Sequence, residues 1–379
     1  MEKKIIAVCQ DPGAACAIAP AIIELEKRGT YDLLVIGYRY SQEVFRNKGI
    51  SFTTFEELGM ESAEAGQLSA FLDREKPSLL ILGTSVVGDS LEKDLTLLAK
   101  EKNIRTLAVL DYWSNYWQRF SGTDGTGRLK YAPDFIAIMD DFAKEEMVRE
   151  GFSEEKLIVT GQPYFDSIKD DYDNFTTEDR KRFLGSLGVD KDDLFVVFAS
   201  QPIEKYRGAG PGKDDFLGFT EKVSRDVLIG ALNGIKKKTG VKFSLFIKLH
   251  PKEDLNDYNM TRECDFPVFV NQEADPRQLI FSADIVTGIT SVFMVEAMFA
   301  RKPVISIQPD LIKKDYLFTN DLGLTEGVYR QEDLEPVLAR VILDKKAGKP
   351  AEGKQDKYLH HPNAAENLLK LIDRVIGEK

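Results

Sequence analysis

The chain has 379 residues, more than one hydrophobic core usually organises, so two domains are expected. Its apolar content of 43% and charged content of 30% are ordinary for a globular protein and exclude a disordered or fibrous chain. With 51 Lys and Arg against 62 Asp and Glu, the net charge of −11 argues against a nucleic-acid partner, because such binding requires clustered cations.

The three cysteines form no CxxC pair, and their odd number favours a reducing compartment over a disulfide framework. No metal-ligand spacing occurs in the sequence, so we expect neither a metal nor a cofactor. The N-terminal apolar run, Ile5 to Val8, is too short for a signal peptide, and no run of about eighteen apolar residues follows. These features predict a cytoplasmic protein with at most peripheral membrane association.

The first half of the chain alternates short apolar runs with amphipathic helical patterns. The strand-like runs lie at residues 4–10, 31–38, 51–55, 78–85, 105–110, 135–139 and 157–161. Continuous apolar runs between amphipathic helices are typical of a parallel sheet that helices cover on both faces. We therefore predict a Rossmann-like, doubly wound domain over residues 1–168.

The middle of the chain is rich in charge and holds no strand-like run, which predicts a linker at residues 169–189 with a short helix at "TTEDRKRFL". The alternation then resumes, with runs at residues 194–200, 242–250, 267–271, 284–288 and 303–309. A second doubly wound domain is expected over residues 190–350, and a closing helix within residues 351–379. The predicted fold class is α/β, with two Rossmann-like domains that face each other across a cleft.

Polar and glycine residues gather directly after the predicted strands of both halves. In an open α/β sheet, ligands bind at the carboxyl ends of the strands, so these residues are candidates for ligand contact. In the first half they include Asp11, Gly13, Asp89 and the segment "DYWSNYW" that begins at Asp111. In the second half they lie in "SQPIEKYRGAGPG", "KLHPKED" and "TGITSVFMVEA". Two such sets predict two ligands, one on each domain.

The segment "DIVTGITSVFMVEAMFA" predicts an anion site. A strand ends at Gly288, and Thr290 and Ser291 offer hydroxyl groups that cap the next helix, whose free N–H groups attract a phosphate. Glu296 is the one acid on this apolar helix. It is either a solvated helix residue or a carboxylate that accepts hydrogen bonds from a ribose diol. Together these residues predict a bound nucleotide.

His250 ends the run "LFIKLH" and is followed by Pro251, which biases His250 toward an extended backbone. A histidine at this place can donate to a phosphate oxygen or protonate a departing phosphate. Lys248 and Gln201 also follow or end predicted strands. We therefore place His250, Lys248 and Gln201 in the nucleotide site.

Four short motifs, in this order, resemble the GT-B superfamily of nucleotide-sugar glycosyltransferases, to which the non-hydrolysing UDP-N-acetylglucosamine epimerases are related in fold. "VTGQPYFD" is similar to the segment that closes the first domain of these enzymes. "KLHP" resembles the His-Pro motif, and Thr290–Ser291 the paired hydroxyl motif, of bacterial sialyltransferases and polyol-phosphate transferases. Glu296 resembles the acid that binds the donor ribose.

The resemblance implies a metal-independent glycosyltransferase, with residues 1–168 on the acceptor side and residues 190–350 binding the nucleotide donor. Such an enzyme moves a sugar from a nucleotide-activated donor to a glycan, lipid-linked or other hydroxyl acceptor, here in bacterial surface polysaccharide biosynthesis. It also implies that the closing helix crosses back onto the first domain. The sequence departs from the family in two places: "QDPGAACAIAP" replaces the "GTRPE"-like loop of the epimerases, and only "GTDG" echoes the acid motif of the sialyltransferases. The identity of the donor therefore does not transfer.

An inverting transfer needs a base that takes the proton of the acceptor hydroxyl, and a carboxylate of the first domain is the expected group. Asp111 follows a predicted strand and is one candidate; Asp11, which follows the first strand, is the rival. Gly13 is an expected acceptor contact, because a glycine allows close approach of the backbone. The other expected acceptor contacts are the four aromatic rings after Asp111, which either stack on a sugar or lipid or pack beneath a loop: Tyr112, Trp113, Tyr116 and Trp117.

Two other classes of protein stay open. A nucleotide-sugar epimerase or hydrolase would share the donor site, and analysis of the products distinguishes it from a transferase. A non-catalytic, two-domain sugar-binding protein would share the architecture. For the transferase, the expected partners are a nucleotide-sugar donor and a hydroxyl acceptor, with a homodimer as a further possibility.

Overall fold

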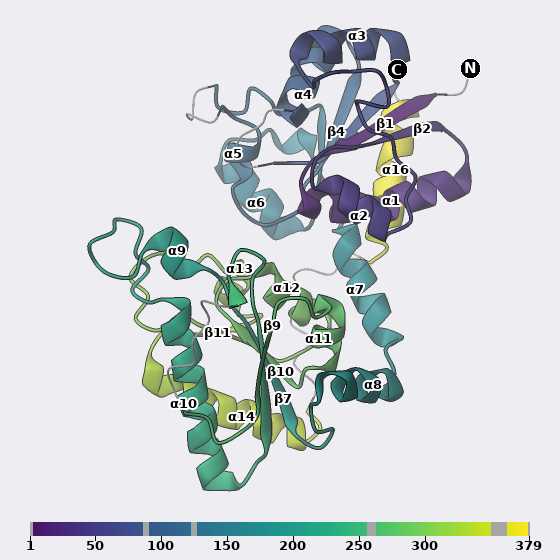
Figure 1. The fold of residues 1–379 in the computed structure, drawn as a ribbon. Coiled ribbons are helices and arrows are strands. Elements are labelled where there is room, and N and C mark those ends of the chain that lie inside the picture. The colour runs from purple at the N-terminus through teal and green to yellow at the C-terminus, as the bar shows by residue number, and fades with distance from the viewer. Residues whose placement is uncertain (1–2, 86–90, 123–126, 256–262, 350–361, 378–379) are drawn as a thin grey trace. The chain divides into compact units, whose positions relative to one another are not determined.

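The computed structural model describes residues 3–85, 91–122, 127–255, 263–349 and 362–377 (Figure 1). The chain divides into two compact units. Unit 1 comprises Met1–Ser167 together with Asp356–Lys379, and unit 2 comprises Ile168–Gln355. Each unit contains one six-stranded sheet, and every strand pairing within the two sheets is parallel.

The sheet of unit 1 has the order β2-β1-β3-β4-β5-β6. Its four inner strands are apolar runs that are buried almost throughout, as expected where helices cover both faces of a sheet, and its two edge strands are partly exposed. The strand bounds are β1 Lys4–Cys9, β2 Asp32–Gly37, β3 Leu79–Leu82, β4 Arg105–Val109, β5 Phe135–Ile138 and β6 Leu157–Val159. The run at residues 51–55, expected as a strand, contributes only an isolated bridge between Ile36 and Thr53.

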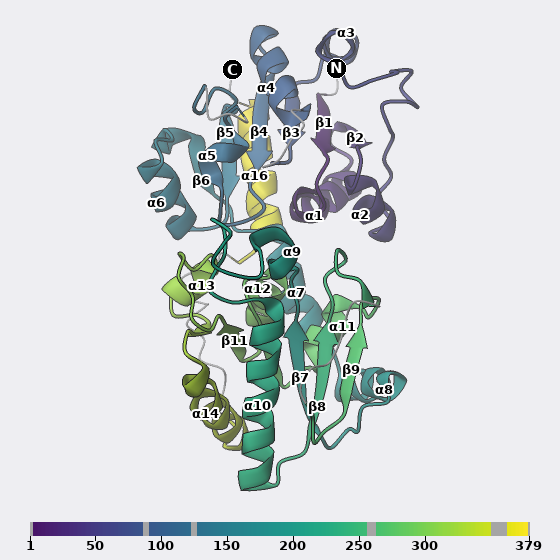
Figure 2. The same ribbon diagram turned by 60° about the vertical axis from the view of Figure 1, so that its left-hand side comes forward.

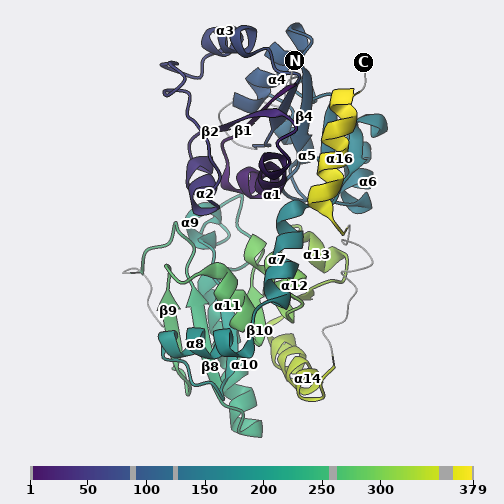
Figure 3. The same ribbon diagram turned by 90° about the vertical axis from the view of Figure 1, so that its right-hand side faces the viewer.

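Successive residues of β1 point into two different cores. Ile5 and Ala7 pack with helices α1 (Pro12–Arg28) and α16 (Ala364–Gly377), whereas Ile6 and Val8 pack with α3 (Ala65–Glu75) and α4 (Leu91–Glu101). Figure 3 shows α16 beside α1 on its face of the sheet. The end of the chain therefore completes the first core of unit 1. The remaining helices of this unit are α2 Ser41–Asn47, α5 Tyr116–Arg119 and α6 Asp141–Arg149.

The segment expected as a linker is mostly helical. Helix α7 spans Pro163–Asp173, and α8 spans Thr177–Leu187. A capping box begins α8: the Thr176 hydroxyl accepts from the N–H of Asp179, and the Asp179 carboxylate accepts from the N–H of Thr176. The short helix predicted at "TTEDRKRFL" is therefore present, within unit 2.

The sheet of unit 2 has the order β12-β11-β10-β7-β8-β9. Helices α10 (Glu221–Thr239) and α14 (Leu334–Lys346) cover one face, where apolar side chains form a continuous core, and α11 (Pro276–Ser282) and α12 (Val292–Phe299) lie on the other face (Figure 2). The other bounds are β7 Leu194–Ala199, β8 Phe243–Lys248, β9 Val268–Asn271, β10 Ile285–Gly288, β11 Val304–Ile307, β12 Glu326–Val328, α9 Ile203–Arg207 and α13 Phe318–Asp321.

Both sheets contain a point at which the chain reverses its direction of winding. In unit 1 this point lies between β1 and β3, and in unit 2 it lies between β7 and β10. Ligands of doubly wound sheets bind at such switch points, beyond the carboxyl ends of the strands. The predicted α/β class with two doubly wound sheets is confirmed. Among the described residues, no helix has the length and apolarity needed to cross a bilayer.

Candidate functional site

Hydrogen bonds connect residues that follow neighbouring strands of unit 2, at and beside its switch point. We call them the unit 2 cluster, which comprises Ser200, Gln201, Lys248, His250, Glu253, Thr290 and Ser291. Gln201 follows β7 and Thr290 follows β10: the N–H of Thr290 donates to Oε1 of Gln201 at 2.7 Å. This bond links the two strand ends that flank the switch point, so the structure brings together two residues that were predicted to bind nucleotide.

Gly288, at the end of β10, permits close packing beside the cluster. A Cβ atom at this position would lie 2.8 Å from Sδ of Met294 and 3.1 Å from the carbonyl oxygen of Ala199. A side chain here would therefore require the Met294 side chain to move and would crowd the backbone at the end of β7.

Helix α12 begins where the sequence predicts an anion site. Ser291 is its N-cap and accepts a hydrogen bond from the N–H of Phe293 at 3.3 Å. Glu296, farther along this helix, is only 8% exposed, so it is not a solvated helix residue. The alternative that Glu296 is a solvated helix residue is therefore wrong, and its contact with a ribose remains a prediction.

His250 lies after β8 in a turn that neighbouring strand ends hold in place. Its N–H donates to Oε2 of Glu253 at 2.8 Å, and the hydroxyl of Ser200 donates to Oε1 of Glu253 at 2.7 Å. Burial lowers the pKa of His250, and the positive charges of Lys252 and Lys248 lower it further. Burial also lowers the pKa of Lys248, whose amino group donates to the carbonyl of Gln272.

The switch point of unit 1 carries carboxylates. We define the unit 1 cluster as Asp11, Gly13, Thr84, Glu92, Asp111 and Arg119. Asp111 is one of the two predicted bases, and its charge is compensated within the unit. Arg119, which is buried, lies 2.6 Å from Oδ1 of Asp111, and the Thr84 hydroxyl donates to the same oxygen at 3.0 Å.

Gly13 allows helix α1 to start directly against Asp111. A Cβ atom on Gly13 would lie 2.5 Å from Oδ2 of Asp111, which is closer than real contacts allow. Asp11, the rival base, is the N-cap of α1, but its side chain makes no capping hydrogen bond. Among the described residues, we find no cation paired with Asp11. The two candidate bases therefore differ in their surroundings: Asp111 is neutralised by Arg119, and Asp11 is not.

Glu92 is a third acid at this switch point, and the sequence reasoning missed it. It is 7% exposed, and its Oε1 accepts a hydrogen bond from the N–H of Gln10 at 3.2 Å. Burial, together with the nearby negative charges of Asp11 and Asp111, raises the pKa of Glu92 to about 7. A signal existed in the sequence, because Glu92 shares its helix face with the apolar residues Leu95 and Ala99.

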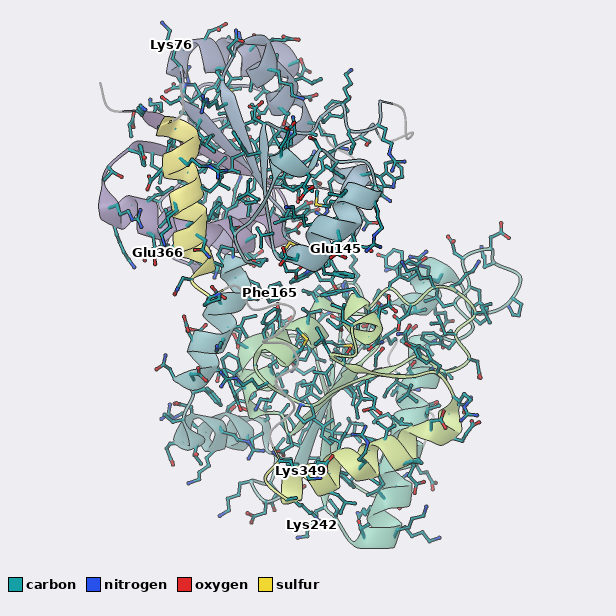
Figure 4. The ribbon with its side chains drawn as sticks, turned by 180° about the vertical axis from the view of Figure 1, so that it is seen from behind. Lys76, Glu145, Phe165, Lys242, Lys349 and Glu366 are labelled. Atoms are coloured by element: carbon teal, nitrogen blue, oxygen red, sulfur yellow. The ribbon has the colours of Figure 1, made fainter. Side chains whose placement is uncertain are left out.

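The four rings after Asp111 divide into two pairs. Trp113 and Tyr116 are 4% and 3% exposed, which corrects the expectation that they form an open stacking surface. The physical reason is a pair of tertiary contacts: Nε1 of Trp113 donates to Oδ2 of Asp140 at 2.6 Å, and its ring packs at 5.4 Å from Phe165, labelled in Figure 4. A buried Trp needs a partner for its N–H, and Asp140 supplies one.

Tyr112 and Trp117 form the second pair and are half-buried. The ring of Trp117 lies 5.5 Å from the guanidinium of Arg128, and Tyr112 meets Trp113 edge-on at 6.0 Å. These two rings keep the predicted acceptor role. Asp89, also predicted to bind the acceptor, lies outside the described residues, as does most of "GTDG".

Sequence reasoning also missed three polar partners of the predicted residues: Thr84, Arg119 and Glu253. A signal for Glu253 was present in "HPKE", since an acid three residues after a turn-forming residue can accept the N–H that begins the turn. Arg119 and Thr84 lie far apart in sequence from each other, and only the tertiary fold brings both to Asp111.

Comparison with known proteins links the chain to one family of transferases. The model of the CDP-glycerol:poly(glycerophosphate) glycerophosphotransferase family matches residues 132–323. This range contains His250, Thr290 and Ser291 but neither Asp11 nor Asp111. A comparison with curated protein sequences found no match.

Solved structures share the fold over the whole chain. The UDP-GlcNAc 2-epimerase of Neisseria meningitidis, bound to UDP-GlcNAc, is similar with a TM-score of 0.67 and 15% identity, covering 98% of this chain and 100% of that one. The UDP-GlcNAc 2-epimerase of Methanocaldococcus jannaschii has a TM-score of 0.67 and 14% identity, with 98% and 99% coverage. A glycosyltransferase of Rickettsia africae has a TM-score of 0.64 and 12% identity, with full coverage of both chains, 100% and 100%. At these identities the likeness establishes the fold, and it agrees with the resemblance to the GT-B superfamily.

Proposed function

Because the chain belongs to the CDP-glycerol:poly(glycerophosphate) glycerophosphotransferase family, we propose that it transfers a polyol-phosphate group from a CDP-linked donor to a hydroxyl acceptor. The observation that carries this proposal is the extent of the family match, which includes the residues of the unit 2 cluster. The sequence predicted transfer of a sugar, whereas this proposal has a polyol-phosphate transferred, because the family is named for transfer of glycerophosphate.

In such a transfer, an acceptor oxygen attacks the phosphorus atom that carries the polyol. The bond between that phosphorus and the bridging oxygen breaks, and CMP leaves with the bridging oxygen. Negative charge grows on the departing phosphate, so donors and cations aimed at it lower the barrier. We assign this role to His250, to Lys248 and to the N-terminus of α12 at Thr290 and Ser291.

The acceptor hydroxyl loses a proton during the attack, and a carboxylate of unit 1 is the proposed base. We favour Asp11 over Asp111, because Arg119 and Thr84 already occupy an oxygen of Asp111. Tyr112 and Trp117 are the proposed acceptor contacts. The proposed acceptor is a hydroxyl of a polyol-phosphate, glycan or lipid-linked chain in surface polysaccharide biosynthesis, and the proposed reaction requires no metal.

A second candidate function is glycosyl transfer from a nucleotide sugar. Two observations favour it: the Neisseria relative in fold was solved with UDP-GlcNAc, and the Rickettsia relative is a glycosyltransferase. In that reaction the bond from the sugar carbon to the phosphate oxygen breaks, and the whole nucleotide leaves. An epimerase would use the same donor without an acceptor.

Product analysis by phosphorus NMR separates these functions. The protein is incubated with CDP-glycerol or with UDP-GlcNAc, each with and without a polyol-phosphate or glycan acceptor. Acceptor-dependent release of CMP from CDP-glycerol supports the proposal, whereas acceptor-dependent release of UDP supports glycosyl transfer. A changed sugar nucleotide without acceptor indicates an epimerase, and binding without any product indicates a binding protein. Equal rates with and without a chelator are expected.

A further inference from the structure

The carboxylate of Glu253 joins the ends of two neighbouring strands. Its Oε1 accepts the hydroxyl proton of Ser200, which follows β7, at 2.7 Å. Its Oε2 accepts the N–H of His250, which follows β8, at 2.8 Å. Both oxygens are therefore used: one holds Ser200, the first residue after β7, and the other holds His250, the second residue after β8.

The third neighbouring strand secures the same turn. Gln272 follows β9, and its side-chain amide donates to the carbonyl oxygens of His250 at 2.7 Å and Glu253 at 2.9 Å. The N–H of Glu253 also donates to the carbonyl of His250 at 2.9 Å, which closes a four-residue turn. The backbone of His250 is thus held from β7, β8 and β9 together.

The turn determines which ring nitrogen of His250 carries the proton. The N–H of Lys252 donates to Nδ1 of His250 at 3.1 Å. A backbone N–H can only donate, so Nδ1 must be the unprotonated nitrogen, and in the neutral ring the proton lies on Nε2. The ring is kept neutral near pH 7, since burial and the charges of Lys252 and Lys248 lower the pKa of His250.

We propose that Glu253 is a positioning residue that holds His250 in the Nε2–H tautomer, so that the imidazole acts as a hydrogen-bond donor and not as a base. Glu253 itself does not touch the ring; it acts through the turn that brings the N–H of Lys252 to Nδ1. The mechanistic consequence rests on the proposed function: the Nε2–H of His250 donates to an oxygen of the departing phosphate. The tautomer itself is a property of the protein without ligand.

The test uses the small number of histidines. The chain contains 3 His, so nitrogen-15 NMR of the imidazole rings, with His250→Gln for assignment, resolves the signal of His250. The free, full-length protein at pH 8 is expected to show protonated Nε2 and unprotonated Nδ1. A His250 signal with the proton on Nδ1, or with both tautomers equally populated, would overturn the proposal.

Glu253→Ala tests the role of the carboxylate. A glutamine could still accept from the N–H of His250 with its amide oxygen and donate to the Ser200 hydroxyl with its NH2 group, whereas alanine removes both contacts. We expect the His250 signal to move toward a mixture of tautomers and the turnover number to fall up to about a hundredfold, with a smaller change in KM. The matched control is Glu332→Ala, at an exposed acid of the same unit, which should change neither. An unchanged tautomer and turnover number in a folded Glu253→Ala protein would contradict the proposal.

A second variant tests the same assignment if Glu253→Ala does not fold. Ser200→Ala removes one partner of Glu253 but leaves its contact with His250, so the Nε2–H tautomer should persist. Loss of that tautomer in Ser200→Ala would contradict the assignment. The two proposals can fail separately: transfer activity with an Nδ1–H tautomer refutes only this inference, and an Nε2–H tautomer in a protein without transferase activity refutes only the proposed function.

Discussion

The two switch points use the same sheet topology, but their residues manage charge in different ways. In unit 1 the switch point holds three acids: Asp111 is paired with Arg119, Glu92 is buried, and Asp11 has no paired cation among the described residues. In unit 2 the strand ends at and beside the switch point carry donors, namely His250, Lys248 and the N-terminus of α12, and both oxygens of the acid Glu253 are occupied by hydrogen bonds. We therefore expect unit 1 to accept a proton and unit 2 to bind an anion.

The largest effect is expected at the proposed base. Asp11→Asn keeps the size of the side chain and removes its ability to accept a proton, so the rate of transfer should fall by about 10² to 10⁴. Binding of the donor should stay unchanged, since the proposed donor contacts belong to unit 2. Steady-state rates with the donor that supports turnover, together with calorimetric titration of CMP, measure the two quantities.

Asp111→Asn is the matched comparison, and it should behave differently. Removing the negative charge leaves the buried guanidinium of Arg119 without its counter-ion, which should lower the free energy of unfolding by about 3–5 kcal/mol. If Asp111→Asn remains stable and loses all transfer while Asp11→Asn is fully active, the base is Asp111. The ion pair with Arg119 would then not prevent Asp111 from accepting a proton.

The next effect concerns the pH dependence of stability. The pKa of Glu92 is raised to about 7 in the folded protein, so the folded form binds this proton more tightly than the unfolded chain does. The free energy of unfolding should therefore decrease as the pH rises from about 4.5 to about 7, by up to about 3 kcal/mol from this group.

Glu92→Gln should lack this decrease, because glutamine stays neutral and can still accept the N–H of Gln10. Urea unfolding of both proteins at pH 5 and pH 8 measures it. The variant should gain stability relative to the parent at pH 8. Parallel pH profiles for the two proteins would show that Glu92 titrates normally.

A smaller effect is expected at the proposed ribose contact. Glu296→Ala removes a buried carboxylate, and loss of a charge-assisted hydrogen bond should weaken nucleotide binding by about 1.5–3 kcal/mol. Calorimetric titration of CMP measures the change, with Glu332→Ala as an exposed control. Unchanged affinity in a folded Glu296→Ala protein would remove Glu296 from the nucleotide site.

The smallest effect separates the buried rings from the half-buried ones. Trp113→Phe leaves Oδ2 of Asp140 without its donor, which should lower the free energy of unfolding by about 1–3 kcal/mol and leave the acceptor KM unchanged. Trp117→Ala should raise the acceptor KM, since its ring is one of the proposed acceptor contacts. A raised acceptor KM in Trp113→Phe without loss of stability would show that Trp113 contacts the acceptor.

Both sheets could be predicted from the sequence, because their strands are short continuous apolar runs and parallel sheets require such runs. The place of Thr290 and Ser291 at the start of a helix could also be predicted, because a helix cap depends on residues that are neighbours in sequence. The surroundings of Asp111 were not, because Arg119, Thr84 and Gly13 reach it from three separate segments. Burial of Trp113 depends likewise on Asp140 and Phe165, which no local pattern connects to it.

The central claim is that the unit 2 cluster binds the nucleotide-activated donor, and calorimetric titration of CDP-glycerol tests it most directly. The parent protein and Asp11→Asn should bind one equivalent with equal affinity, whereas a Thr290→Val, Ser291→Ala double variant should bind about tenfold or more weakly. Equal affinity in the double variant, with binding lost in Asp11→Asn, would contradict the assignment of the donor to unit 2.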